Sequence, residues 1–251
     1  MAIYDLNQVE LNQLMQPNID PSVRSAVLQF LFGAGSSNST LNNSGPGNGN
    51  NDNSNHDQHH GNGGDHHGDH HGDDHHGDDH SPHSPPPAPE VMVQISNGTD
   101  PLDPNADVLN LTSDSATVTT GGHLQAIIQN VGGDSNLMVF GHQDVMIATG
   151  VGDNQVSLFD SGNDIVLTGS GNDTVFGGAG KDTIVGGAGD DSLIAGSGNR
   201  TLLNGESGND TLLGGSGMND SLLGGDGNDL LVAGHGAHQF ADGGKGNDTL
   251  L

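Results

Sequence analysis

The C-terminal part of the chain repeats a glycine-rich unit of nine or ten residues without interruption. Each unit joins a glycine-rich half, which forms a turn because glycine accepts a positive φ, to a short half that forms a brief strand. Two units make one coil, so alternate strands stack into two parallel sheets around a thin aliphatic core. Apart from Phe159, which opens the first unit, the ten units cover residues 160–251 and read FDSGNDIVL, TGSGNDTVF, GGAGKDTIV, GGAGDDSLI, AGSGNRTLL, NGESGNDTLL, GGSGMNDSLL, GGDGNDLLV, AGHGAHQFA and DGGKGNDTLL.

One apolar position in each strand is predicted to face inward. These positions are Val166, Val175, Ile184, Leu193, Leu202, Leu212, Leu222, Leu231, Phe240 and Leu250. The next residue is also apolar and should face outward by strand alternation. These outer residues are Leu167, Phe176, Val185, Ile194, Leu203, Leu213, Leu223, Val232, Ala241 and Leu251. The outer stripe is either partly covered by irregular flanks or a surface for self-association or a partner.

The turns carry acidic residues that stack from coil to coil. One row consists of Asp173, Asp191, Asp210, Asp229 and Asp248. The other row consists of Asp164, Asp182, Arg200, Asp220 and His238. Stacked carboxylates oppose folding unless a cation lies between them, and calcium fits because it takes both carboxylate and carbonyl oxygens. Arg200 either places its guanidinium where a calcium ion would lie or points to solvent.

The predicted calcium ligands are the turn carboxylates together with backbone carbonyls of the turn glycines. The carboxylates are those of Asp164, Asp173, Asp182, Asp191, Asp210, Asp220, Asp229 and Asp248. The carbonyls are those of Gly162, Gly171, Gly178, Gly180, Gly187, Gly189, Gly208, Gly217, Gly225, Gly227 and Gly246.

With its pattern G-G-x-G-x-D-x-U-x, where U is apolar, this region resembles the RTX (hemolysin-type) calcium-binding nonapeptide repeats. The resemblance implies an all-β, right-handed parallel β-roll that binds calcium between adjacent turns and folds when it does so. It also implies bacterial type I secretion, without a cleaved signal peptide, to the extracellular space or the cell surface. The chain stops at Leu251 inside a repeat. We therefore expect either a truncated record or an open end that stacks on another molecule.

Residues 91–159 contain short β-type runs that begin near Asp, Asn or Gly at spacings close to ten. This spacing predicts degenerate rungs of the same solenoid. A small antiparallel sandwich would also suit the short runs, but the spacing would then be a coincidence.

Residues 1–35 are predicted to be helical, with one stretch at residues 5–16 and another that starts at Asp20-Pro21 and ends at Gly33. This element either folds on itself, caps the next domain or docks on a partner. Residues 36–90 are predicted to be a disordered linker, since Leu41 is their only Leu, Ile, Val or Phe.

The linker contains a histidine and aspartate tract that is a second candidate metal site. Imidazoles beside carboxylates bind zinc, nickel or copper. The candidate ligands are His66, His67, His70, His71, His75, His76 and His80. The alternative is a solvated linker whose charge changes as its histidines protonate.

The formal net charge of −28 disfavours nucleic acid and anionic membranes as partners. No cysteine is present, so thiolate sites and disulfides are excluded, and no apolar run is long enough for a membrane span. No catalytic motif was found. Together with what the resemblance implies, this predicts a secreted, non-catalytic calcium-binding protein with a structural, adhesive or interaction role. The alternatives are a calcium-triggered matrix, surface-layer or filament component, metal sequestration by the histidine tract, and a truncated module of a larger enzyme or toxin.

Overall fold

The computed structural model describes residues 2–33 and 91–251, and these belong to one unit of the chain. The predicted linker at 36–90, with its histidine tract, lies outside the described residues.

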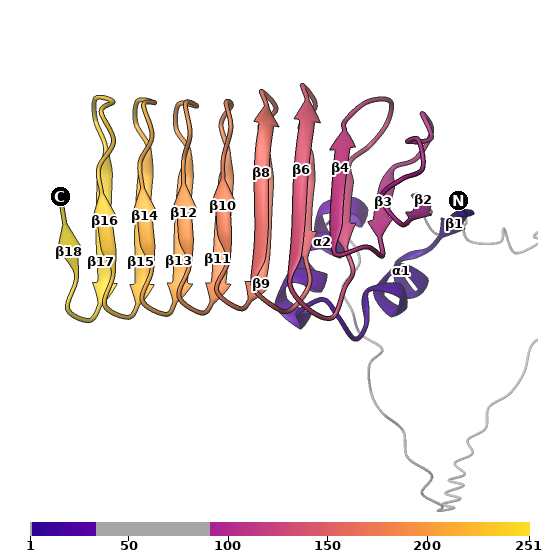
Figure 1. The fold of residues 1–251 in the computed structure, drawn as a ribbon, viewed down its shortest axis with the longest axis horizontal. Coiled ribbons are helices and arrows are strands. Elements are labelled where there is room, and N and C mark those ends of the chain that lie inside the picture. The colour runs from indigo at the N-terminus through magenta and orange to yellow at the C-terminus, as the bar shows by residue number, and fades with distance from the viewer. Residues whose placement is uncertain (1, 34–90) are drawn as a thin grey trace, which may run out of the picture. The chain divides into compact units, whose positions relative to one another are not determined.

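The described chain forms two β-sheets that run side by side (Figure 1). The first sheet contains, in spatial order, β1 (Ala2–Leu6), β2 (Val91–Ser96), β3 (Val108–Leu111), β5 (Ala126–Gln129), β7 (Met146–Thr149), β9 (Ile165–Ser170), β11 (Thr183–Ala188), β13 (Leu202–Ser207), β15 (Ser221–Asp226) and β17 (Phe240–Lys245). The second contains β4 (Ser115–Thr119), β6 (Ser135–Gly141), β8 (Asn154–Asp160), β10 (Thr174–Phe176), β12 (Ser192–Ile194), β14 (Thr211–Leu213), β16 (Leu230–Val232) and β18 (Thr249–Leu250).

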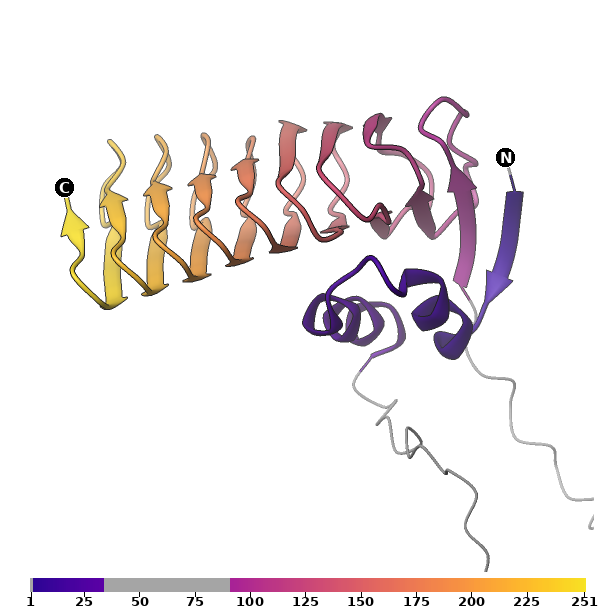
Figure 2. The same cartoon turned by 60° about the horizontal axis from the view of Figure 1, so that its bottom comes forward.

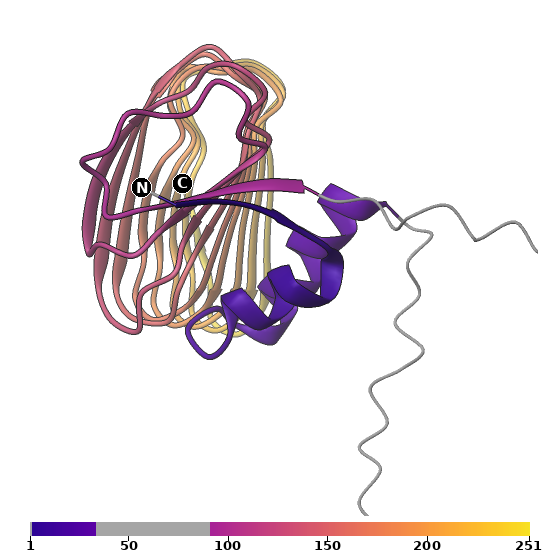
Figure 3. The same ribbon diagram turned by 90° about the vertical axis from the view of Figure 1, so that its right-hand side faces the viewer.

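From β3 onward the chain alternates between the two sheets, and each strand pairs in parallel with the strand two places later. Seen end-on in Figure 3, the coils superpose as one closed loop. This confirms the predicted parallel β-solenoid. The prediction of solenoid rungs also holds for residues 91–159, and the antiparallel sandwich was the wrong alternative, because β3 to β8 pair only in parallel.

The core between the sheets is a column of aliphatic side chains. Its fully buried members in the repeats include Val166, Val175, Ile184, Leu193, Leu203, Leu212, Leu222 and Leu231. Three predicted inward positions differ. Leu203 lies inside instead of Leu202, Ala241 packs on the core instead of Phe240, and Leu250 is half exposed in the last strand.

Two of these shifts, at Leu203 and Ala241, follow from one extra residue in the preceding turn. A third turn also has an extra residue but leaves Leu222 inward as predicted, and Leu250 is exposed because it lies in the last strand. Arg200, Asn219 and His238 adopt a positive φ of 62° to 64°, a conformation that lets a tight turn take up an additional residue. After Arg200 and after His238, the strand is therefore displaced by one position, and its side chains exchange faces. Leu203 and Ala241 accordingly leave the predicted outer stripe, in which Phe176 and Leu251 are exposed.

The N-terminal segment forms one strand and two helices. Helix α1 (Gln8–Met15) begins at a capping box made by Asn7 and Glu10. Helix α2 (Pro21–Phe32) begins at Asp20, whose carboxylate accepts a hydrogen bond from the Ser22 amide, and ends at Gly33. Strand β1, which the sequence analysis did not anticipate, pairs antiparallel with β2 at the edge of the first sheet.

Both helices lie against the outer face of the first sheet, beside its N-terminal strands (Figure 2). Leu11, Met15, Val23 and Val27 pack there on apolar side chains of β2, β3, β5 and β7. The loop between the helices is also tied to the solenoid, because the Val151 amide donates a hydrogen bond to the Asn18 carbonyl at 2.9 Å. Of the predicted alternatives, this arrangement is nearest to a cap on the next domain, although the helices cover a face of the first sheet and only β1 covers its edge.

Candidate metal centre

Glycines in the turns allow successive coils to approach each other closely. A Cβ atom on Gly180 would overlap the carbonyl oxygen of Gly162 one coil earlier, and one on Gly198 would overlap that of Gly180. Gly180 also has a φ of 134°, which side-chain-bearing residues rarely adopt. The predicted glycine ligands lie in the turns, except Gly187 and Gly225, which lie near the ends of β11 and β15. The turns therefore present columns of backbone carbonyls.

One column of carboxylates runs through the turns that lead into the second sheet. It contains Asp173, Asp191, Asp210, Asp229 and Asp248, as predicted from the sequence. In each of them Oδ1 accepts a hydrogen bond from a backbone amide one coil earlier, at 2.7 to 3.0 Å. All but Asp248 are buried. This column is continuous through the repeats.

The second column, which leads into the first sheet, is interrupted. Asp164 and Asp182 accept amide hydrogen bonds from Val145 and Asp164 at 2.9 and 3.0 Å, and Asp220 accepts one from Thr201 at 3.0 Å. The strand register places Thr201 between Asp182 and Asp220. Thr201 is fully buried, and among the described residues its hydroxyl has no hydrogen-bond partner.

The prediction that Arg200 and His238 occupy this column was wrong. The register gives the two positions to Thr201 and Gln239. Arg200 and His238 are the extra residues of their turns and are exposed. Arg200 thus points to solvent, which was one of its two predicted roles.

The second oxygen of each buried carboxylate is left unpaired. Within the described residues, Oδ2 of Asp164, Asp173, Asp182, Asp191, Asp210, Asp220 and Asp229 is buried without a hydrogen-bond partner. In the continuous column these oxygens lie against glycines of the first sheet: a Cβ on Gly186 in β11 would overlap Oδ2 of Asp191, and one on Gly205 in β13 would overlap Oδ2 of Asp210. Burying a carboxylate without a partner costs folding free energy, so a cation bound in each turn would stabilise the fold.

Burial is the main cause of a raised pKa along both columns. It raises the pKa of Asp164, Asp182 and Asp191 from 3.8 to about 7, and that of Asp210 to about 6. The pKa values of Asp173 and Asp229 also rise by burial. In the absence of a cation, the folded turns therefore favour protonated carboxyl groups.

The donors in these turns fit calcium. Within the described ranges, no group of three or more His, Cys, Asp and Glu side chains is placed to hold a metal ion. A turn instead offers few carboxylates beside several carbonyls. Such all-oxygen sets suit calcium, whereas zinc sites usually need three or four side-chain ligands.

Asp160 is a candidate ligand that the sequence analysis missed. It ends β8, is 8% exposed, and both of its carboxylate oxygens are buried without a hydrogen-bond partner among the described residues. The signal was present, because Asp160 is the second residue of its unit, where the other nine units have glycine.

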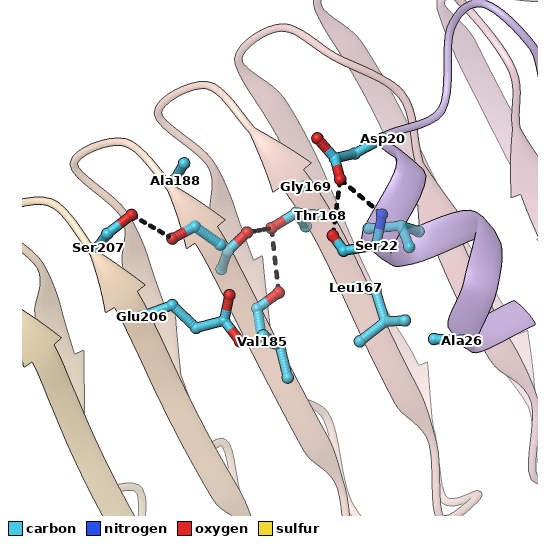
Figure 4. A pocket seen from close by; sticks show the side chains of 13 residues that line it. Asp20, Ser22, Ala26, Leu167, Thr168, Gly169, Val185, Ala188, Glu206 and Ser207 are labelled. Carbon is cyan, nitrogen blue, oxygen red and sulfur yellow. Dashed lines mark hydrogen bonds between the residues drawn. The ribbon is translucent and has the colours of Figure 1, made fainter.

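A groove lies between α2 and the first sheet (Figure 4). Apart from the exposed Glu206, its polar side chains are engaged in local structure. Asp20 caps α2, the Thr168 hydroxyl donates to the Gly186 carbonyl at 2.7 Å, and the Ser207 hydroxyl donates to the Gly187 carbonyl at 3.3 Å. The groove therefore shows no set of groups for chemistry.

The scan against protein families matches the region that carries the two columns. Four copies of the RTX calcium-binding nonapeptide repeat match residues 160–193, 167–202, 202–217 and 215–237. These turns belong to the RTX family. RTX repeats bind calcium and form a β-roll. No curated protein and no solved structure matches the chain.

A substitution can test whether Thr201 occupies a ligand position of the second column in the RTX roll. Thr201→Asp is expected to raise the number of bound calcium ions, because it places a carboxylate in register between Asp182 and Asp220. Equilibrium dialysis with calcium measures this number. Arg200→Asp is the matched control and should leave it unchanged, since residue 200 is exposed and out of register. A higher count in the control alone would contradict the observed register.

Proposed function

We propose that this chain is a secreted, non-catalytic protein whose RTX roll folds on extracellular calcium and then serves a structural, adhesive or interaction role. The observation that carries the proposal is the run of buried carboxylates from Asp164 to Asp229 whose Oδ2 atoms lack partners among the described residues. A dication in each turn would supply the missing charge and hold neighbouring coils together.

The composition of the turns supports an extracellular calcium range. Calcium affinity rises with the number of charged ligands, and extracellular modules bind at about 10⁻⁴ to 10⁻³ M. Turns with few carboxylates and many carbonyls belong at this weak end. The chain would then remain unfolded at low cytoplasmic calcium, would pass through an export channel in that state, and would fold outside. No helix among the described residues is long and apolar enough to cross a membrane.

A calcium-triggered assembly is the second candidate, and exposed aromatic side chains favour it. Phe140 and Phe159 stack on each other with ring centroids 5.1 Å apart on the outer side of β6 and β8, and both are exposed. Phe176 on the neighbouring strand β10 is exposed too. Exposed apolar groups of this kind mark surfaces that bind another molecule.

The test is a calcium titration of the full chain, followed by circular dichroism and light scattering. We expect β-sheet signal to increase with calcium and to be lost on chelation, while magnesium at the same concentration has little effect because it requires tighter octahedral geometry. A calcium-dependent increase in mass would favour assembly. A zinc titration tests the histidine tract separately. The proposal fails if the signal is the same with calcium and with chelator.

A further inference from the structure

Asp160 lies where the N-terminal rungs meet the first turn of the RTX repeats. Counting back from the turn carboxylate, it stands four residues before Asp164, as Gly178 stands four residues before Asp182. Its Oδ1 lies 3.3 Å from the position of a Cβ on Gly178. The turn therefore has a carboxylate where the next coil has only backbone, and the neighbouring glycine leaves space beside it.

Asp160 adds a second buried carboxylate to the turn that carries Asp164. The Asp164 carboxyl group and the charge of Asp182 both act on its carboxyl group. Both oxygens of Asp160 and Oδ2 of Asp164 have no partner among the described residues. No Lys or Arg side chain forms a described ion pair with either group, since the described pair joins Lys245 to Asp226.

Such a pair of buried carboxylates cannot remain doubly charged without a cation. Two like charges in a poorly solvated turn repel each other, and each also loses its hydration. A calcium ion between them satisfies three orphan oxygens at once, and backbone carbonyls of the turn can complete its shell of six to eight oxygens. The other turns offer the ion fewer orphan carboxylate oxygens.

We propose that Asp160 and Asp164 together hold the first calcium ion of the roll, more tightly than the turns that follow. This inference rests on the proposed calcium function and deepens it. The site adjoins β6 and β8, which pair with each other in parallel. Among the described residues before Asp160, no buried carboxylate oxygen lacks a hydrogen-bond partner. Since each coil is stabilised by its neighbours, the first calcium-bound coil forms on rungs that are already folded, and later coils add toward the C-terminus. The site would thus set the calcium concentration at which folding starts.

The test compares wild type with Asp160→Asn, which keeps the side-chain shape and removes the charge. Calorimetry and dialysis measure the bound calcium, and hydrogen exchange follows the strands. For wild type we expect a tight class of one ion, with β9 and β11 protected at lower calcium than β15 and β17. For the variant we expect one fewer bound ion, because the affinity of the tight site falls tenfold or more (about 1.4 kcal/mol). Strands β9 and β11 should then gain protection at the same calcium concentration as β15 and β17.

Asp153→Asn is the matched control, because it removes the same charge from an exposed carboxylate beside the other column, where Asp153 accepts a hydrogen bond from the Asn172 amide at 2.7 Å. It should keep the tight class. Asp160→Gly, which restores the residue of the other units, serves as a second variant if the amide perturbs folding. An unchanged tight class in both Asp160 variants would overturn the inference. If wild type itself did not respond to calcium, the proposed function would fail instead.

Discussion

Calcium-free protein brought from about pH 8 to about pH 5 is expected to gain β-sheet structure in the roll. The pKa values of Asp164, Asp182 and Asp191 are raised to about 7 in the folded state, against 3.8 for the unperturbed group. The folded state therefore binds protons more tightly than the unfolded state. The resulting stability is fully present below about pH 4 and is lost as the pH rises toward 7. Protons would thus partly replace calcium.

Circular dichroism in the presence of chelator measures this gain. High salt at about pH 8 is the control, since it screens the net charge without protonating buried carboxyl groups. The same linkage predicts that calcium affinity falls as the pH drops through about 7, because protons compete for the same oxygens. A chelated roll that was equally structured at both pH values, or that recovered in salt alone, would show that the buried carboxylates do not control folding.

Chelation is expected to remove hydrogen-exchange protection from β9 to β18, whereas β3 to β8 and the two helices keep theirs. The orphan carboxylates begin at Asp160 and continue through the roll. The earlier rungs have the larger apolar core, which includes Ile127, Leu137 and Ile147, and the helices bury the outer face of the first sheet there. The difference should reach several orders of magnitude in exchange rate for the core amides, because one part unfolds globally and the other does not.

The measurement is exchange followed by mass spectrometry of peptides on either side of residue 160. Readdition of calcium should restore protection to β9 to β18 and change the earlier strands little. Val27→Ala offers a control with the opposite pattern. It removes two buried carbon atoms from the contact of α2 with the first sheet, which costs about 2 kcal/mol of folding free energy, and should destabilise the early rungs with or without calcium. Loss of protection along the whole solenoid on chelation would mean that the early rungs also depend on the metal.

Much of the calcium site follows from local pattern. The acidic column from Asp173 to Asp248 could be predicted because its units all place Asp directly before the strand. The other column could not, because the stretch Asn199-Arg200-Thr201 contains one extra residue. The sequence does not show whether Arg200 or Thr201 takes the place of the acidic residue. The strand pairing of Leu202 with Thr183 resolves this, and it moves Thr201 into the column.

The N-terminal segment shows the same limit. Asp20-Pro21 and Gly33 mark the ends of α2 because capping involves residues close in sequence. The place where α2 packs depends on Val23 and Val27 meeting strands more than a hundred residues later, such as β5 and β7. Strand β1 likewise forms only because β2 offers an unpaired edge.

The sequence by itself determined the solenoid, its aliphatic core and its rows of turn carboxylates, because each repeat carries its own turn, strand and acidic residue. Only the tertiary structure decided which residues stand in register, which carboxylate oxygens lack a partner, and where the helices cover the sheet. These properties depend on contacts between residues 18 or 19 positions apart, or further. One extra residue in a turn changes such contacts while leaving the repeat pattern intact.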